Sequence, residues 1–243
     1  MPDIATKNLY HVIDELESLV EKISEPRQLL RDINPIFKEI LTDEELMNRI
    51  LSHLYSNNEF INGNINLINR NEVVFFRSSK SGFSLRLFIW EPETYSIIHD
   101  HGSWGVIGAS LSRLQIENYQ RNDDSSQPEY ADLSVSERMI LEHGESTGTL
   151  PFNLGIHQVG NPDKKSAISI SLYGKALRKG YIYGFVPEEK KAFRLFPPKL
   201  EKRLLALKAL EDLGWKAPGS LFSEALRESR PVVCRPGVLN KKK

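Results

Sequence analysis

The chain has 243 residues, which is enough for one large domain or for a domain with appendages. Lys plus Arg equals Asp plus Glu at 32 each, so no overall basic field favours nucleic acid or an anionic membrane as a partner. Apolar runs fall short of the roughly 18 residues of a membrane span, and the N-terminal residues lack a signal pattern. The single cysteine, Cys234, excludes an internal disulfide and fits a reducing compartment, so we expect a cytoplasmic protein.

Residues 1–56 are predicted to form an N-terminal helical arm. Apolar residues recur there at helical steps of three and four: Leu9, Val12, Ile13, Leu16, Leu19 and Val20. Pro26 and Pro35 interrupt the region, which predicts several helices, and Thr42-Asp-Glu-Glu45 has capping-box spacing for a helix through Leu54. The arm could bind a partner or pack on the outside of the rest of the protein, and we favour the packed layer.

Residues 57–186 show the shorter period of β-strands. Strands are expected in 61–71, 73–76, 83–90, 97–98, 105–119, 130–141 and 167–173, with turn signals between them. Many short strands without helical patterns between them predict an antiparallel sandwich or jelly-roll barrel. From Pro187 onwards helix signals return, at 200–213 and 220–228, so residues 187–243 are predicted to be a C-terminal helical extension packed on the barrel.

Three histidines in the predicted barrel form a candidate metal site. His99 and His101 project to the same side of an extended strand because side chains alternate with period two, and a neighbouring strand can bring His157 to the same point. Such a set leaves about half of the positions of an octahedral metal open, which favours a catalytic site over a structural one. A lone histidine in a strand is more often a packing residue, and His143, before Gly144, is the rival third ligand.

The motifs around these histidines resemble those of a known family. They are His99-Asp-His101, Trp104-Gly-Val-Ile-Gly108, His157-Gln-Val-Gly-Asn161, Ser169-Ile-Ser-Leu-Tyr173-Gly174 and the upstream strand Phe83–Trp90. Together they resemble the thiol dioxygenases of the cupin superfamily, the group of cysteine dioxygenase and 3-mercaptopropionate dioxygenase, over about residues 70–174. The resemblance implies a mainly β cupin fold, a double-stranded β-helix. The N-terminal and C-terminal helical appendages predicted from the sequence pattern lie outside the part that the resemblance covers, and we expect a monomer or homodimer.

The resemblance also implies the chemistry of the site. Fe(II) would be held by His99, His101 and His157 without a carboxylate ligand, and O2 would oxidise a small thiol to its sulfinate. This implication agrees with the chemistry of the residues, since imidazole suits iron and a neutral ligand set leaves the negative charge for a thiolate to supply.

Further residues match the family singly. Arg70, in Arg70-Asn71, matches the arginine that binds the substrate carboxylate, and Arg77 and Arg86 are its rivals. We assign Arg70, Arg86 and Trp104 to substrate binding. Tyr173 matches the active-site tyrosine and Ser169 the first member of a Ser-His-Tyr hydrogen-bonded series, so these two are the expected catalytic residues.

The sequence departs from the family at several places, one of which is Gly108-Ala-Ser-Leu-Ser112, where the glycine expected at the strand-ending turn is absent. Ser171 stands where the hydrogen-bonded series has histidine, and no cysteine lies near Trp104 to form the thioether crosslink of animal cysteine dioxygenases. Two alternatives therefore stay open. One is another three-histidine cupin dioxygenase that cleaves a carbon–carbon bond, and the other is a catalytically silent metal-binding cupin that acts as a binding or regulatory module.

Overall fold

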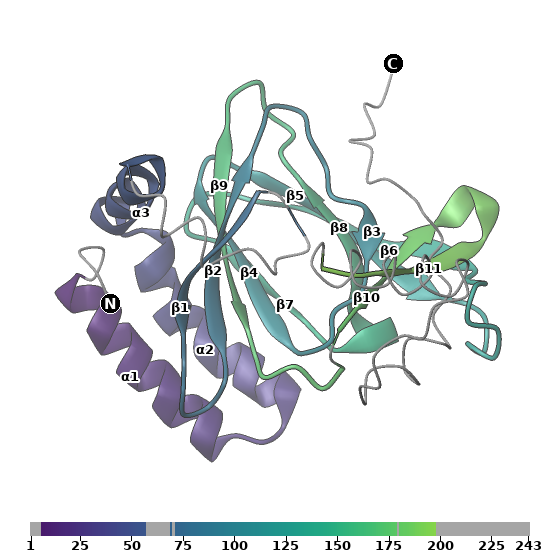
Figure 1. The fold of residues 1–243 in the computed structure, drawn as a ribbon, viewed down its shortest axis with the longest axis horizontal. Helices are drawn as coiled ribbons and strands as arrows, with labels where there is room; N and C mark the ends of the chain where they lie inside the picture. Colours follow the sequence, from purple (N-terminus) through teal and green to yellow (C-terminus); the bar gives the residue numbers. More distant parts are fainter. Residues whose placement is uncertain (1–5, 57–68, 70, 179, 198–243) are drawn as a thin grey trace, which may run out of the picture.

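In the part of the chain that the structure describes, three α-helices are followed by strands arranged in two sheets (Figure 1). The computed structural model describes residues 6–56, 69, 71–178 and 180–197. The helices are α1 (Lys7–Lys22), α2 (Pro26–Leu41) and α3 (Glu44–Ser56). The strands are β1 (Glu72–Arg77), β2 (Ser84–Trp90), β3 (Ile98–His99), β4 (Gly105–Leu111), β5 (Leu114–Arg121), β6 (Leu133–Leu141), β7 (Ser146–Thr149), β8 (Ile156–Gly160), β9 (Ala167–Tyr173), β10 (Ile182–Val186) and β11 (Lys191–Leu195).

All strand pairs are antiparallel. One sheet has the order β1-β2-β9-β4-β7, and the other has the order β11-β10-β3-β8-β5-β6. The inner faces of the two sheets pack on each other, because one buried cluster joins Phe88 and Ile107 of the first sheet to Ile116 and Val159 of the second. This is an antiparallel two-sheet jelly-roll barrel, as the sequence predicts. The helices expected within 200–228 lie outside the described residues.

Strand β9 is buried along its whole length because both of its faces are covered. Its apolar residues Ile168, Ile170 and Leu172 belong to the core beneath the helices. Its alternate residues Ser169, Ser171 and Tyr173 therefore face the barrel interior. One strand thus connects the packing of the helical layer to the lining of the barrel.

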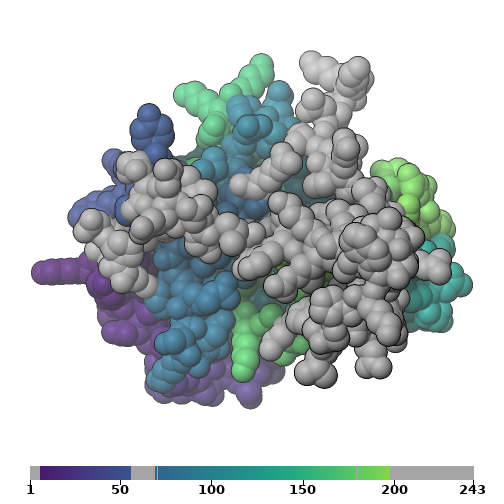
Figure 2. Space-filling model, viewed as in Figure 1, coloured from purple at the N-terminus to yellow at the C-terminus, as the bar shows by residue number. Residues whose placement is uncertain are grey.

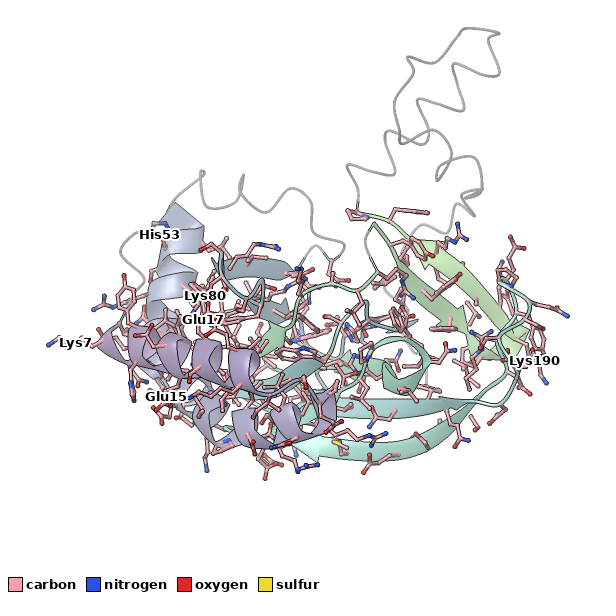
Figure 3. All side chains as sticks on the ribbon, turned by 90° about the horizontal axis from the view of Figure 1, so that it is seen from below. Lys7, Glu15, Glu17, His53, Lys80 and Lys190 are labelled. Atoms are coloured by element: carbon pink, nitrogen blue, oxygen red, sulfur yellow. The ribbon has the colours of Figure 1, made fainter. Side chains whose placement is uncertain are left out.

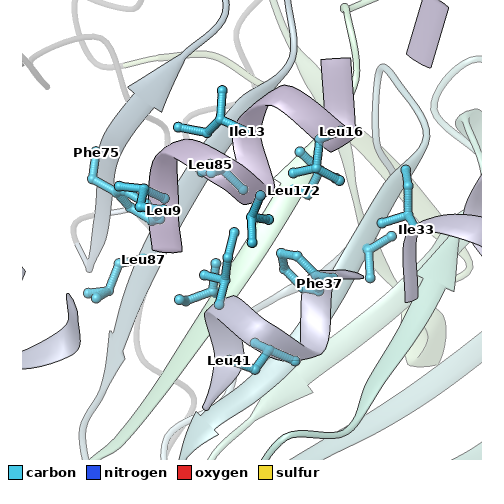
Figure 4. Close-up of a cluster of buried hydrophobic side chains, with 14 of the residues drawn as sticks. Leu9, Ile13, Leu16, Ile33, Phe37, Leu41, Phe75, Leu85, Leu87 and Leu172 are labelled. Atoms are coloured by element: carbon cyan, nitrogen blue, oxygen red, sulfur yellow. The ribbon is translucent and has the colours of Figure 1, made fainter. Parts of the chain in front are cut away.

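Helices α1 and α2 pack on the outer face of the five-stranded sheet (Figure 4). Leu9, Phe37 and Leu85 are fully buried in this interface, where Leu172 of β9 joins them. Leu41 of α2 lies directly on Gly108 of β4, with no space for a β-carbon, and the Ser110 hydroxyl donates a hydrogen bond to the Leu41 carbonyl at 2.8 Å. The helices are therefore a packed layer, as favoured from the sequence, rather than a free arm.

Two helix boundaries differ from those expected. Helix α2 continues through Pro35, which lies on the exposed face, because the buried residues Ile33 and Phe37 hold the helix to the sheet on either side of it. Helix α3 is capped by Asp43, which accepts from the Leu46 amide at 2.8 Å. The hydroxyl of Thr42 instead donates to the Lys38 carbonyl, so the capping box expected at Thr42 is wrong.

Two β segments also differ from those expected. The region 105–119 is divided at Ser112, whose φ of 72° makes the turn between β4 and β5. Lys191–Leu195, placed in the helical extension, is instead a strand that pairs with β10. The barrel therefore extends past residue 186 to Leu195.

The helical layer and the β10–β11 hairpin lie at opposite ends of the long axis (Figures 1 and 2). The turn between β1 and β2 reaches the helical end, where Lys80 lies near Glu17 of α1 (Figure 3) and its ammonium group is 2.7 Å from the Glu21 carboxylate. Among the described residues, we find no helix with the length and hydropathy needed to span a membrane.

We predict that Gly108→Val loosens the helical layer, because its side chain would overlap Leu41. Overpacking of this kind should lower the free energy of unfolding by about 1–3 kcal/mol in urea titrations. Combining it with Leu41→Ala should cost less than the sum of the two single changes. Strict additivity would show that these two side chains do not meet in solution.

Candidate metal centre

The pairing of β3 with β8 brings the histidines together. His99 of β3 is directly opposite His157 of β8, so both side chains project from the same face of the sheet. His101 follows two residues after His99 and projects to the same side. The three rings are nearly inaccessible to solvent, with exposed fractions of 8% for His99, 8% for His101 and 2% for His157.

The geometry of the cluster suits a single metal ion. The ring centroids are 4.7–5.0 Å apart, and the Nε2 atoms of His101 and His157 are 2.8 Å apart. The candidate ligand atoms of the three residues all lie within 4.8 Å of one another. Nitrogen ligands bind an ion such as zinc at about 2.0–2.1 Å, so nitrogens grouped in this way can share one ion after small adjustments.

The protonation state of the histidines also suits a metal. Burial lowers the pKa of each ring, and at His101 and His157 the neighbouring imidazoles lower it further. Neutral imidazole is the form that binds metals. The Nδ1 atom of His99 donates a hydrogen bond to the Ile97 carbonyl at 2.9 Å, because a carbonyl can only accept, and this leaves the Nε2 lone pair for an ion.

A buried ion pair supports the histidine strand. Asp100, between two of the histidines, is 1% exposed; it accepts from the Tyr183 amide at 2.7 Å and pairs with Arg178. The Arg178 guanidinium lies 5.1–5.2 Å from the ring centroids of Phe152, Tyr181 and Tyr183. The Oδ2 atom of Asp100 is buried and finds no hydrogen-bond partner among the described residues. Sequence analysis missed both members of this pair, and the only signal was the placement of an aspartate between two histidines.

Tyr173 forms the wall beside His101. Its ring stacks on the His101 ring with centroids 5.0 Å apart, and burial raises the pKa of its hydroxyl to about 12. The Arg86 guanidinium also lies over the Tyr173 ring, with its central carbon 4.9 Å from the ring centroid. Gly105 is opposite Tyr173 in register, and a β-carbon there would come within 2.6 Å of the ring. Only glycine leaves space for the tyrosine at this point.

The two serines of β9 have different partners. Ser169 accepts a hydrogen bond from the indole N–H of Trp90 at 2.9 Å. Ser171, which stands in place of the family's histidine, interacts with Tyr173, and its hydroxyl partly offsets the effect of burial on the tyrosine pKa. Of these two serines, Ser171 therefore interacts with the tyrosine and Ser169 with Trp90.

The remaining predicted residues lie in several places. Arg70 is outside the described residues, and Arg77 is exposed at the end of β1. Trp104 packs over Gly174 and against the core that the sheet shares with the helices. His143 is exposed, hydrogen-bonds the Ser110 carbonyl and does not join the cluster of described metal-ligating residues.

The asparagine of the His157 motif has a structural role. The Asn161 side chain is fully buried. Its amide donates to the carbonyls of Glu91 at 3.1 Å and Lys165 at 2.7 Å, and its oxygen accepts from the Asp163 amide at 2.9 Å. These bonds hold the end of β8 in place and so help to fix the strand that carries His157.

Comparison with known proteins found cupin structures of low similarity to this chain. No protein-family model matches the sequence. A cupin 2 conserved barrel domain protein from Salinispora arenicola is 15% identical, with 45% of this chain and 81% of that chain covered and a TM-score of 0.33. A cupin superfamily protein from Desulfitobacterium hafniense is 10% identical, with 43% and 75% covered and a TM-score of 0.31. An oxalate oxidase in complex with glycolate is 15% identical, with 40% and 44% covered and a TM-score of 0.31.

The strand order and the histidine cluster together define an antiparallel jelly-roll barrel with a three-histidine site suited to a metal ion.

We predict that His157→Ala lowers the affinity for a divalent metal by more than about a hundredfold, since even residues that only support metal ligands are worth up to that much. Titration of metal-free protein with Co(II), followed by its visible absorption, measures this affinity. His143→Ala is the matched control and should bind Co(II) like the wild type. Equal losses in the two variants would contradict the assignment of the third ligand.

We predict that Arg178→Gln destabilises the protein by about 3 kcal/mol, because it leaves the Asp100 carboxylate buried without its cation. Chemical denaturation of the metal-free protein gives this value. Adding Asp100→Asn removes the uncompensated charge and should recover part of the loss. A double variant that is less stable than Arg178→Gln alone would argue against this explanation.

Proposed function

We propose that the protein is an Fe(II)-dependent dioxygenase that oxidises a small thiol to its sulfinate with O2. The observation that carries the proposal is the cluster of three buried, neutral imidazoles, which no carboxylate of the described residues joins. We further propose that the protein works in the cytoplasm, where the single Cys234 and a thiol substrate would both remain reduced.

The donor set favours this chemistry. Imidazole suits iron, and three uncharged ligands leave negative charge to be supplied by an anionic substrate such as a thiolate. When bound, Fe(II) would supply open coordination positions at which the thiolate sulfur and O2 can meet. Both atoms of O2 end on sulfur, and the sulfur supplies all the electrons, so the reaction needs no external reductant.

The residues of the chain would position the substrate and exclude water. The nearly complete burial of the histidines keeps the site dry, which strengthens every electrostatic interaction within it. Because the pKa of Tyr173 is about 12, its hydroxyl stays protonated near neutral pH and can donate a hydrogen bond from Oη to a sulfur or oxygen atom of the reacting group. Ser171 can extend this hydrogen bond but cannot act as a base near neutral pH.

One observation favours a second candidate, a catalytically silent metal-binding module. Ser171 replaces the histidine of the family's hydrogen-bonded series, and Ser169 is engaged with Trp90 rather than with Tyr173. A proton relay from Ser169 to Tyr173 is therefore interrupted. Such a module would still bind a metal and a ligand, but it would release no oxidised product.

The experiment loads metal-free protein with Fe(II) under anaerobic conditions and then adds O2 with cysteine, 3-mercaptopropionate or cysteamine. We expect O2 consumption matched by sulfinate, with both oxygen atoms labelled when ¹⁸O2 is used. His157→Ala and the zinc-loaded wild type are controls that should be inactive. Fully iron-loaded protein that forms no sulfinate from any of the three thiols would rule out the proposal, and carbon–carbon cleavage of a diketone would identify the other dioxygenase class.

We predict that Tyr173→Phe lowers kcat about tenfold, which corresponds to the loss of one hydrogen bond to a charged group. Iron content should be unchanged, since the ring that stacks on His101 is retained. Steady-state O2 consumption with metal analysis of the same sample tests this. Unchanged turnover would remove the Tyr173 hydroxyl from the reaction.

A further inference from the structure

A second buried ion pair lies on the barrel wall beside the histidines, and it is formed by Glu72 of β1 and Arg86 of β2. Glu72 is opposite Phe88, a residue of the barrel interior, and Arg86 is two residues before Phe88, so both side chains belong to the inner face. Arg86 lies over the Tyr173 ring, which in turn stacks on His101. Two ring contacts therefore connect the ion pair to the three-histidine cluster.

The pair is largely shielded from solvent. The Glu72 side chain is 3% exposed and the Arg86 side chain is 26% exposed. Buried ion pairs seldom increase stability relative to apolar residues of the same volume, because removing two charges from water is costly. The packing of β1 on β2 therefore does not explain why this position holds two charges, and the neighbouring site offers a reason.

The fields of both residues reach the cluster. Burial dominates the pKa of each group in the site, and beyond burial Glu72 raises the pKa of His99 and of Tyr173. Arg86 acts in the opposite sense and lowers the pKa of His101 and of Tyr173. A ligand at the histidines would therefore meet a positive and a negative group on the same wall.

The geometry of the pair leaves hydrogen-bonding capacity for a ligand. Nη1 of Arg86 meets Oε1 of Glu72 at 2.5 Å, and Nε of Arg86 donates to Ser84 Oγ at 2.9 Å. The pair thus meets through one atom of each group. Among the described residues no hydrogen bond is formed by Nη2 of Arg86 or Oε2 of Glu72, which are the second donor and the second acceptor. Nη2 can bind a carboxylate oxygen, and Oε2 can bind an ammonium group.

The charge balance decides which ligand fits best. Without Glu72, the arginine would favour any thiol with a carboxylate. With Glu72 beside it, Arg86 is already neutralised, so the carboxylate of a purely anionic ligand would add a negative charge that no cation balances. A ligand that also carries an ammonium group can satisfy both residues. Arg178, the other cation that acts on His101, is itself neutralised by Asp100 and does not change this balance.

We infer that Glu72 is a specificity-determining residue which, paired with Arg86, makes the site select thiols that carry an ammonium group beside a carboxylate over purely anionic thiol acids. The inference rests on the proposed function for the identity of the reaction. It adds the residue that recognises the amine, which sequence analysis did not include among the site residues.

The test measures binding separately from turnover. Protein loaded with Co(II), kept free of O2, is titrated with cysteine, 3-mercaptopropionate and cysteamine, and thiolate binding is followed by the sulfur-to-cobalt charge-transfer band. We expect the wild type to bind cysteine most tightly. Glu72→Gln keeps the shape and a hydrogen-bond acceptor for Arg86 but removes the charge, so it should shift the ratio of affinities about tenfold or more towards 3-mercaptopropionate.

Further variants guard against a loss of folding. Arg86→Gln should shift the ratio in the opposite direction, towards cysteamine. The matched control is Glu117→Gln, which changes a glutamate that pairs with Arg138 at 2.6 Å on the neighbouring sheet and should leave all ratios unchanged. If Glu72→Gln does not fold, the ratio measured with Arg86→Gln decides the question alone.

The outcomes separate this inference from the proposed function. Equal or stronger binding of 3-mercaptopropionate by the wild type, or ratios that do not respond to Glu72→Gln and Arg86→Gln, would overturn the inference even if sulfinate is formed. The expected ratios without sulfinate formation in the iron-loaded protein would support the inference for binding and overturn the proposed oxidation.

Discussion

The site depends on the register between β3 and β8. His99 and His157 come from distant parts of the chain, yet they are direct partners across the two strands. A shift of one residue in this pairing would turn one of the two rings to the opposite face of the sheet, because side chains alternate along a strand. Asn161 fixes one end of β8 through the hydrogen bonds of its side chain, and the bonds of Asp100 fix the chain immediately after His99. The register between β3 and β8 is therefore fixed on both sides of the three-histidine cluster.

Charge inside the barrel is compensated locally. Arg86 pairs with Glu72 on one side of the histidines, and Arg178 pairs with Asp100 on the other. The imidazoles themselves are neutral because burial lowers their pKa values. An ion bound to them would thus bring the first uncompensated charge to this part of the barrel, and it would attract the anionic sulfur of a thiolate.

Much of the fold and the core of the site could be predicted from the sequence, since they depend on short-range patterns. The spacing of His99 and His101, the alternation in β9 and the apolar stripe of α1 all carry the period of the element that they form.

The two barrel ion pairs could not be predicted as pairs, because Asp100 and Arg178 meet only through the closure of the barrel. The strand at 191–195 was missed because its pairing with β10, rather than its own pattern, makes it a strand. Thr42 was chosen as a cap over Asp43 because adjacent residues of similar capping propensity are not separated by spacing alone.

The burial of β9 on both faces also limits how the protein can be truncated or recombined. Its apolar residues need the helices, and its polar residues face the histidines. Deleting the first 56 residues would leave Ile168, Ile170 and Leu172 in contact with water along a strand whose alternate residues face the barrel interior. A shorter fragment with an intact barrel is therefore not available by truncation at that end, and an exchange of the barrel between proteins must carry the N-terminal layer with it.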